Sequence, residues 1–90
     1  MPYIIKAKRV ILDSFVNGIV KKVITVGDLN YVITTLILKY LKTEGVRYQT
    51  LNAVRGVLGD VKVEFDRRVY VPYETKKRKE NGDIEDFNIV

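Results

Sequence analysis

The chain has 90 residues, of which 47% are hydrophobic, and this length is typical of one small domain with a single core. It contains no Cys and no His, which excludes disulfides, zinc sites of the usual kind, and catalysis by a thiol or an imidazole. The formal net charge of +5 favours encounters with anions such as nucleic acids, phosphate-bearing small molecules or acidic protein surfaces, although a lysine excess also serves solubility.

The first predicted helix covers roughly residues 6–24. Its apolar side chains recur at helical spacing, whereas its frequent β-branched residues and Gly18 weaken the local propensity. The segment before it lacks the long apolar core of a secretory signal. The sequence contains no run of about 18 apolar residues, so no membrane span is predicted. We therefore expect a cytoplasmic protein. The apolar positions of this helix are Leu12, Phe15, Val16, Ile19 and Val23.

The second predicted helix begins at Asp28 and ends before Gly45. The carboxylate of Asp28 can accept the first free amide protons, which predicts this residue as the N-cap. Gly45, after Glu44, is typical of a helix C-terminus. The apolar stripe of this helix is formed by Leu29, Ile33, Leu36, Ile37, Tyr40 and Leu41.

The third predicted helix begins near Gln49 or Thr50. An apolar stripe continues from there at helical spacing, through Leu51, Val54, Leu58, Val61, Phe65 and Val69. Residues 61–65 also alternate between apolar and charged side chains, as a half-buried strand does, so an α+β fold with a strand at 61–71 is the alternative. We favour one long helix because the stripe crosses the disputed region without changing phase.

Pro72 interrupts the third helix, because proline lacks an amide proton and crowds the preceding turn. We expect a kink or an end there, followed by a short helical extension through Lys79 that Asn81-Gly82 closes. The acidic and then apolar tail, residues 83–90, either packs on a neighbouring surface or stays loose.

These elements predict an all-α fold, a single domain over residues 1–90 with three helices, of which the third is long and kinked. The first two helices carry apolar residues beyond the width of one helix face, for example at Val10-Ile11-Leu12 and Leu36-Ile37-Leu38. Either a tightly buried central helix or a partner chain must cover this surplus. We favour a homo-oligomer.

Residues 64–83 concentrate side chains that bind anions and aromatic rings around Pro72. Guanidinium groups offer paired donors that match phosphate or carboxylate, and a tyrosine can stack on a base or donate a hydrogen bond to a phosphate. Asn30 and Tyr31 in the second helix offer similar contacts. The predicted ligand-binding residues are Asn30, Tyr31, Arg67, Arg68, Tyr73 and Lys77.

Each candidate also has a purely structural interpretation. The arginines can pair with Glu64, Glu74 or Asp60, and the tyrosines can be core residues whose hydroxyl reaches water. Asn30 can extend the cap of the second helix, and the lysine-rich run 76–79 can be a solvated face. Without His or the spacing of a metal site, no catalytic residue, metal or cofactor is expected.

Short motifs stand in a specific order between Asp28 and Asp83: Asp28-Leu29-Asn30-Tyr31-Val32-Ile33-Thr34, Asn52, Gly56-Val57-Leu58, Lys62, Glu64-Phe65, Arg67-Arg68-Val69, Pro72-Tyr73-Glu74, Lys77 and Glu80-Asn81-Gly82-Asp83. In this order they resemble a family of small uncharacterised phage and bacterial proteins. The chain departs from that family in its N-terminal segment and at Asp66, where an aromatic residue is usual. The resemblance implies a viral or mobile-element setting and an all-helical fold, without an established activity.

The residues and the resemblance together favour a non-enzymatic, oligomeric binding protein. It would capture a small phosphate-containing ligand at a subunit boundary, such as a nucleotide immune signal of the host, and so act against host defence in the host cytoplasm. One alternative is a nucleic-acid-binding protein, although no helix-turn-helix signature is evident. The other is an inhibitor that blocks a host protein through its surface.

Overall fold

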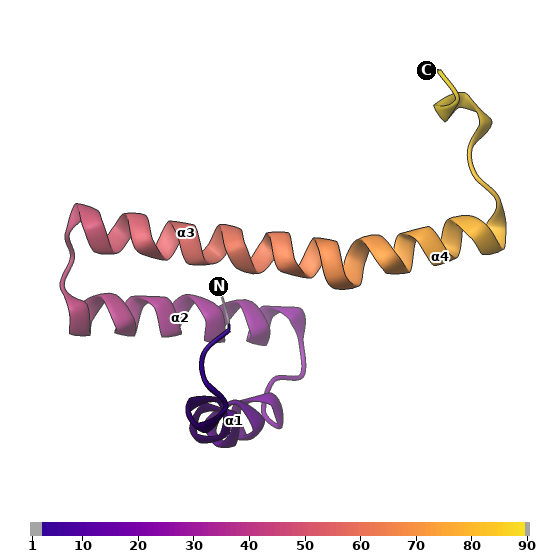
Figure 1. The fold of residues 1–90 in the computed structure, drawn as a ribbon. Coiled ribbons are helices and arrows are strands. Elements are labelled where there is room, and N and C mark those ends of the chain that lie inside the picture. Colours follow the sequence, from indigo (N-terminus) through magenta and orange to yellow (C-terminus); the bar gives the residue numbers. More distant parts are fainter. Residues whose placement is uncertain (1–2, 90) are drawn as a thin grey trace. The chain divides into compact units, whose positions relative to one another are not determined.

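The computed structural model describes residues 3–89 and shows an all-α fold (Figure 1). No strand occurs within this range, so the alternative of an α+β fold is wrong. In chain order the elements are α1 (Lys6–Val20), α2 (Val26–Glu44), α3 (Tyr48–Phe65), a π-helical turn (Asp66–Tyr70), α4 (Val71–Asn81) and a 3-10 turn (Glu85–Phe87).

The chain divides into two units, Met1–Val57 and Leu58–Val90. The first unit holds α1, α2 and the first part of α3, and the second holds the rest of α3, the π-helical turn, α4 and the tail. The boundary lies inside α3. The single domain over residues 1–90 that the sequence indicates stays a prediction.

The N-terminus of α2 differs from the prediction. Asp28 is not the N-cap; Thr25 is, and the two residues form a reciprocal capping box. The Thr25 hydroxyl accepts a hydrogen bond from the Asp28 amide at 3.0 Å. The Asp28 carboxylate in turn accepts hydrogen bonds from the amides of Thr25, at 3.1 Å, and Ile24, at 3.0 Å.

The capping box makes the start of α2 sensitive to acid. The hydrogen bond from the Thr25 backbone and then that from Ile24 hold the pKa of the Asp28 carboxyl below its ordinary value. A depressed carboxyl pKa stabilises the folded state at pH values above the unfolded pKa of aspartate, about 3.9. This contribution is lost as the pH falls through the lower pKa of the folded state.

Thr25→Ala is expected to lower the free energy of unfolding by about 1 kcal/mol, because the first amides of α2 lose the hydroxyl that caps them. Urea unfolding at one fixed protein concentration measures the change. The control is Thr43→Ala, since the Thr43 hydroxyl only donates back to the Lys39 carbonyl within α2. Equal losses in the two variants would contradict the cap assignment.

A tight turn joins α2 to α3. Gly45 ends α2 as predicted: its φ is 96°, and its amide donates to the Leu41 carbonyl at 2.8 Å. The Thr50 hydroxyl then donates to the Gly45 carbonyl at 2.6 Å and accepts from the Arg47 amide at 3.0 Å. These bonds satisfy backbone groups of the turn, and α3 begins at Tyr48, just before the predicted start.

The disturbance predicted at Pro72 takes the form of the π-helical turn that precedes it. The Val71 amide donates to the Asp66 carbonyl, five residues back, instead of four as in an α-helix. Pro72 then lies in the first turn of α4, where the absence of an amide proton is tolerated. Helix α4 ends at Asn81 with Gly82 at φ 84°, which confirms the predicted stop.

The expected core is missing. None of residues 3–89 is buried, and the exposed large hydrophobic side chains range from 37% at Ile19 to 86% at Ile24. Even in the tail, Ile84 and Phe87 lie beside Tyr70 and Glu74 around an open cavity of about 560 Å³ without being buried. The apolar stripes of the helices are therefore accessible to solvent or to a partner.

Candidate functional site

The predicted arginines lie in the π-helical turn of the second unit, and both contact the half-buried carboxylate of Glu64. Arg67 Nη2 lies 2.9 Å from Glu64 Oε1 and 3.2 Å from Oε2. Arg68 Nη1 lies 3.9 Å from Oε2. The pairing that the sequence offered as the structural interpretation is therefore present, and Glu64 offsets part of the charge that an anion would meet.

Tyr73 and Lys77 form a second pair, one turn apart on α4. The Lys77 Nζ lies 5.7 Å from the centroid of the Tyr73 ring, which is within the range of a cation–π interaction. It also lies 3.3 Å from Glu80 Oε2. Lys77 is thus held between a ring and a carboxylate.

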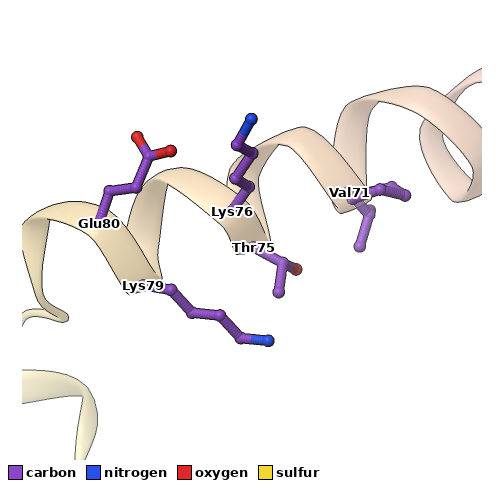
Figure 2. Close-up of a pocket in the computed structure, with 6 residues that line it drawn as sticks. Val71, Thr75, Lys76, Lys79 and Glu80 are labelled. Carbon is purple, nitrogen blue, oxygen red and sulfur yellow. The ribbon is translucent and has the colours of Figure 1, made fainter.

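The other lysines of the run 76–79 do not converge on one point. Lys76 and Lys79 line a cavity of about 560 Å³ with Val71, Pro72, Thr75 and Glu80. In Figure 2 their side chains leave α4 in different directions, and Lys76 extends on the side of Glu80. This arrangement fits a solvated, charge-balanced face better than a phosphate clamp.

Asn30 and Tyr31 lie in α2 of the first unit. The Asn30 side-chain oxygen accepts a hydrogen bond from the Thr34 hydroxyl at 3.1 Å, and Thr25 provides the cap, so the interpretation of Asn30 as part of the cap is wrong. Tyr31 is 69% exposed, which also excludes its interpretation as a core residue of this chain. Tyr31 is available to a ligand.

Tyr31 faces a groove that sequence reasoning did not foresee. The α1–α2 groove has a volume of about 630 Å³, within the range of small-molecule sites. A second aromatic ring, that of Phe15 on α1, lines it and is also 69% exposed. Its lining residues are Ser14, Phe15, Gly18, Ile19, Lys22, Val23, Asp28, Tyr31 and Val32.

The groove has one cationic and one anionic side chain. Lys22, just after the end of α1, supplies an ammonium group. Asp28 supplies a carboxylate, but the Ile24 and Thr25 amides already donate to one of its oxygens. Lys22 is therefore the charged group of the groove that can meet a phosphate.

The net positive charge of the chain lies in the unit that contains this groove. Residues 1–57 hold nine basic and three acidic residues, a net charge of +6, whereas residues 58–90 hold seven and eight, a net charge of −1. The sequence-based prediction of the site followed the cationic side chains of residues 67–79. It named Glu64, Glu74 and Asp60 as possible partners of the arginines, but it did not compare the net charges of the two halves of the chain. A charge count for each half of the sequence would have given this signal.

The structure thus brings the six predicted residues together only in part. Arg67 joins Arg68 on Glu64, and Tyr73 joins Lys77, while Tyr31 lies in the α1–α2 groove. Phe15 and Lys22 are additional candidates because they share that groove with Tyr31.

Among residues 3–89, no helix is long and apolar enough to span a membrane. Within the same range, no group of three or more His, Cys, Asp or Glu side chains is placed to hold a metal ion.

Comparison with known proteins identifies the family of the chain. No curated protein and no solved structure matches it. A family model described as "Domain of unknown function (DUF6899)" matches residues 1–84, which includes the N-terminal segment where the motif resemblance ended. The chain belongs to this family of uncharacterised proteins.

Proposed function

We propose that this protein is a non-enzymatic binding protein that captures a small phosphate-containing ligand, a nucleotide, and that it works as a homo-oligomer. The α1–α2 groove carries this proposal. Two exposed aromatic rings, Phe15 and Tyr31, line it together with the ammonium group of Lys22. It lies in the unit with a net charge of +6.

These groups suit the two parts of a nucleotide. A base can stack on an aromatic ring, and each stacked base contributes about 1–3 kcal/mol to binding. The phosphates are attracted by Lys22 and by the positive field of the first unit. Stacking and charge neutralisation require no proton transfer, so they support retention of the ligand rather than its conversion.

The predicted residues of the second unit fit this proposal as contributions from a neighbouring copy. A subunit of 90 residues encloses a nucleotide poorly by itself, and a boundary between copies makes a deeper site. There Arg67 and Arg68 supply guanidinium donors that reach a phosphate by exchanging part of their contact with Glu64. Tyr73 and Lys77 supply a ring and a cation.

The motif resemblance to phage and bacterial proteins supplies the setting of the proposal. A phage-encoded protein that holds a nucleotide immune signal keeps that signal from its host receptor, in the cytoplasm of the infected cell. Binding without turnover is sufficient for such an anti-defence role when the protein is as abundant as the signal.

Nucleic-acid binding is the second candidate, and the charge of the first unit favours it. A net charge of +6 over 57 residues can follow a phosphate backbone without reading bases. Affinity for random duplex or single strands would then fall steeply with salt, whereas binding of a mononucleotide or dinucleotide in the groove depends on the rings as well.

Thermal denaturation with a panel of cyclic and linear nucleotides tests the proposed function. A true ligand is expected to raise the melting temperature, with about 2.7 kcal/mol of stabilisation at 100 times its Kd. Lys22→Gln is expected to weaken that ligand about tenfold, or about 1.4 kcal/mol. Lys39→Gln on α2, outside the groove lining, is the control and leaves Kd unchanged. The proposal fails if no nucleotide stabilises the protein.

A further inference from the structure

The second unit contains an apolar stripe that the rest of this unit does not cover. Its members follow one another at intervals of three or four residues, so they lie on one face of the helical run. This distal stripe consists of Leu58, Val61, Phe65, Val69 and Tyr73, which are 45%, 60%, 53%, 55% and 57% exposed.

The π-helical turn keeps the stripe together. Phe65 ends α3, Val69 lies inside the turn and Tyr73 lies in α4. A π-helical turn, with hydrogen bonds between residues five apart, rotates less per residue than an α-helix. One such turn therefore moves the apolar stripe around the helix axis by only a fraction of a full rotation. Val63 is the contrast, because it stands two residues from both Val61 and Phe65 and therefore faces away from them.

A helix with an uncovered stripe has little to stabilise it. Residues 58–81 form a helical run of about 36 Å, at about 1.5 Å per residue. Most helical stability in proteins comes from packing of an apolar face, and isolated helices are marginal in water. The α4 segment gains little from propensity, since it holds five charged side chains in succession around Lys76–Glu80. The distal stripe therefore requires a partner surface.

The stripe is wide enough to take part in an interface. It offers five large side chains that are each about half exposed, and a standard interface takes about 800 Å² from each partner.

Charge is compatible with a second copy of this unit as the partner. The second unit has a net charge of −1, so two copies of it approach one another with little repulsion, whereas two first units, each at +6, repel. The side chains beside the stripe are already paired within the chain, as Lys62 with Asp66 at 2.8 Å. An apolar stripe flanked by neutralised charges is complementary to itself under twofold symmetry.

We infer that a second copy of this chain docks on the distal stripe, so that the second units of two subunits pack against each other. The inference rests on the proposed function only in that both invoke an assembly of copies; it needs no ligand. Tyr73 belongs both to the stripe and to the Tyr73–Lys77 pair, so docking would place this pair at the subunit boundary.

Val61→Asp tests the inference against the matched control Val63→Asp. The two valines are equally exposed, at 60%, and lie on the same helix, so the substitutions have the same cost in helix propensity. Sedimentation equilibrium is expected to give at least twice the mass of one chain for the wild type and for Val63→Asp. Val61→Asp is expected to dissociate at least 100-fold more readily, because it places a carboxylate in the interface. A monomeric wild type, or equal behaviour of the two variants, overturns the inference.

Single cysteines provide a test that does not require a destabilising substitution. The native chain has no Cys, so a short bismaleimide links only the introduced thiols. Val61→Cys is expected to yield a covalent dimer and Val63→Cys to remain single; the reverse result contradicts the inference. Nucleotide binding is measured on the same samples. Assembly without binding defeats the proposed capture of a nucleotide and leaves the docking of a second copy intact. Nucleotide binding by a monomer defeats the docking and the homo-oligomeric part of the proposed function, and leaves nucleotide capture intact.

Discussion

Replacement of Tyr31 by alanine is expected to weaken nucleotide binding by about 10- to 100-fold. The expectation follows from the stacking energy of one base on one ring, about 1–3 kcal/mol, whose middle range of about 1.4–2.7 kcal/mol equals 10- to 100-fold, together with the exposure of this ring in the α1–α2 groove. Titration calorimetry with the best ligand of the nucleotide panel measures the change in Kd. Tyr31→Phe separates stacking from hydrogen bonding, since it keeps the ring and should retain affinity within about threefold.

Tyr48→Ala is the matched control for this experiment. Tyr48 is the first residue of α3, is 81% exposed and does not line the α1–α2 groove. Its loss is expected to leave Kd unchanged while it removes a similar amount of apolar surface. If both alanine variants bind as the wild type does, the groove is not the ligand site. If Tyr31→Phe binds as weakly as Tyr31→Ala, the hydroxyl and not the ring makes the contact.

Alanine at Gly45 is expected to lower the free energy of unfolding by about 1–3 kcal/mol. Gly45 ends α2 with φ 96° and ψ 143°, a conformation that side chains with a Cβ rarely adopt. The cost comes from the backbone and not from crowding, because a Cβ there would meet the Arg47 side chain at an ordinary 3.8 Å. Urea unfolding of both proteins at one concentration measures the difference.

Gly56→Ala is the control with the opposite sign. Gly56 lies inside α3, and a Cβ built there has no neighbour within 4 Å, so alanine gains helix propensity without a clash. It is expected to raise the free energy of unfolding by about 0.5–1 kcal/mol. A Gly45→Ala protein as stable as the wild type would show that α2 can end in another conformation. A destabilised Gly56→Ala would show that a partner approaches this position of α3.

The helices could be predicted from the sequence because apolar periodicity and terminal residues act locally. The stops at Gly45 and Gly82 follow from the ability of glycine to adopt positive φ. The cap of α2 was misplaced because Asp28 does form bonds of the capping kind, but from the third helical position, toward the amide of Thr25. The strand alternative for 61–71 failed because alternation over a few residues is also compatible with a helix that has no buried face.

The candidate site could be predicted only in its residue types. Tyr31, the arginines and Lys77 are exposed and chemically suited to an anion, as the sequence indicated. Their grouping depends on tertiary contacts, which local patterns do not determine. The proximity of Phe15 and Lys22 to Tyr31 follows from how α1 approaches α2 through the short connection after Lys22, and no spacing rule contains that information.

Because no side chain among residues 3–89 is buried, the folding of this protein is expected to depend on its concentration in the cell. If packing between copies supplies the missing core, the folded fraction follows mass action, and dilution alone unfolds the chain. Few copies would then be degraded soon after synthesis, whereas many copies would protect one another from proteolysis. The level of folded protein would then show a threshold. Below a certain rate of synthesis almost no folded protein is present, and above that rate it accumulates.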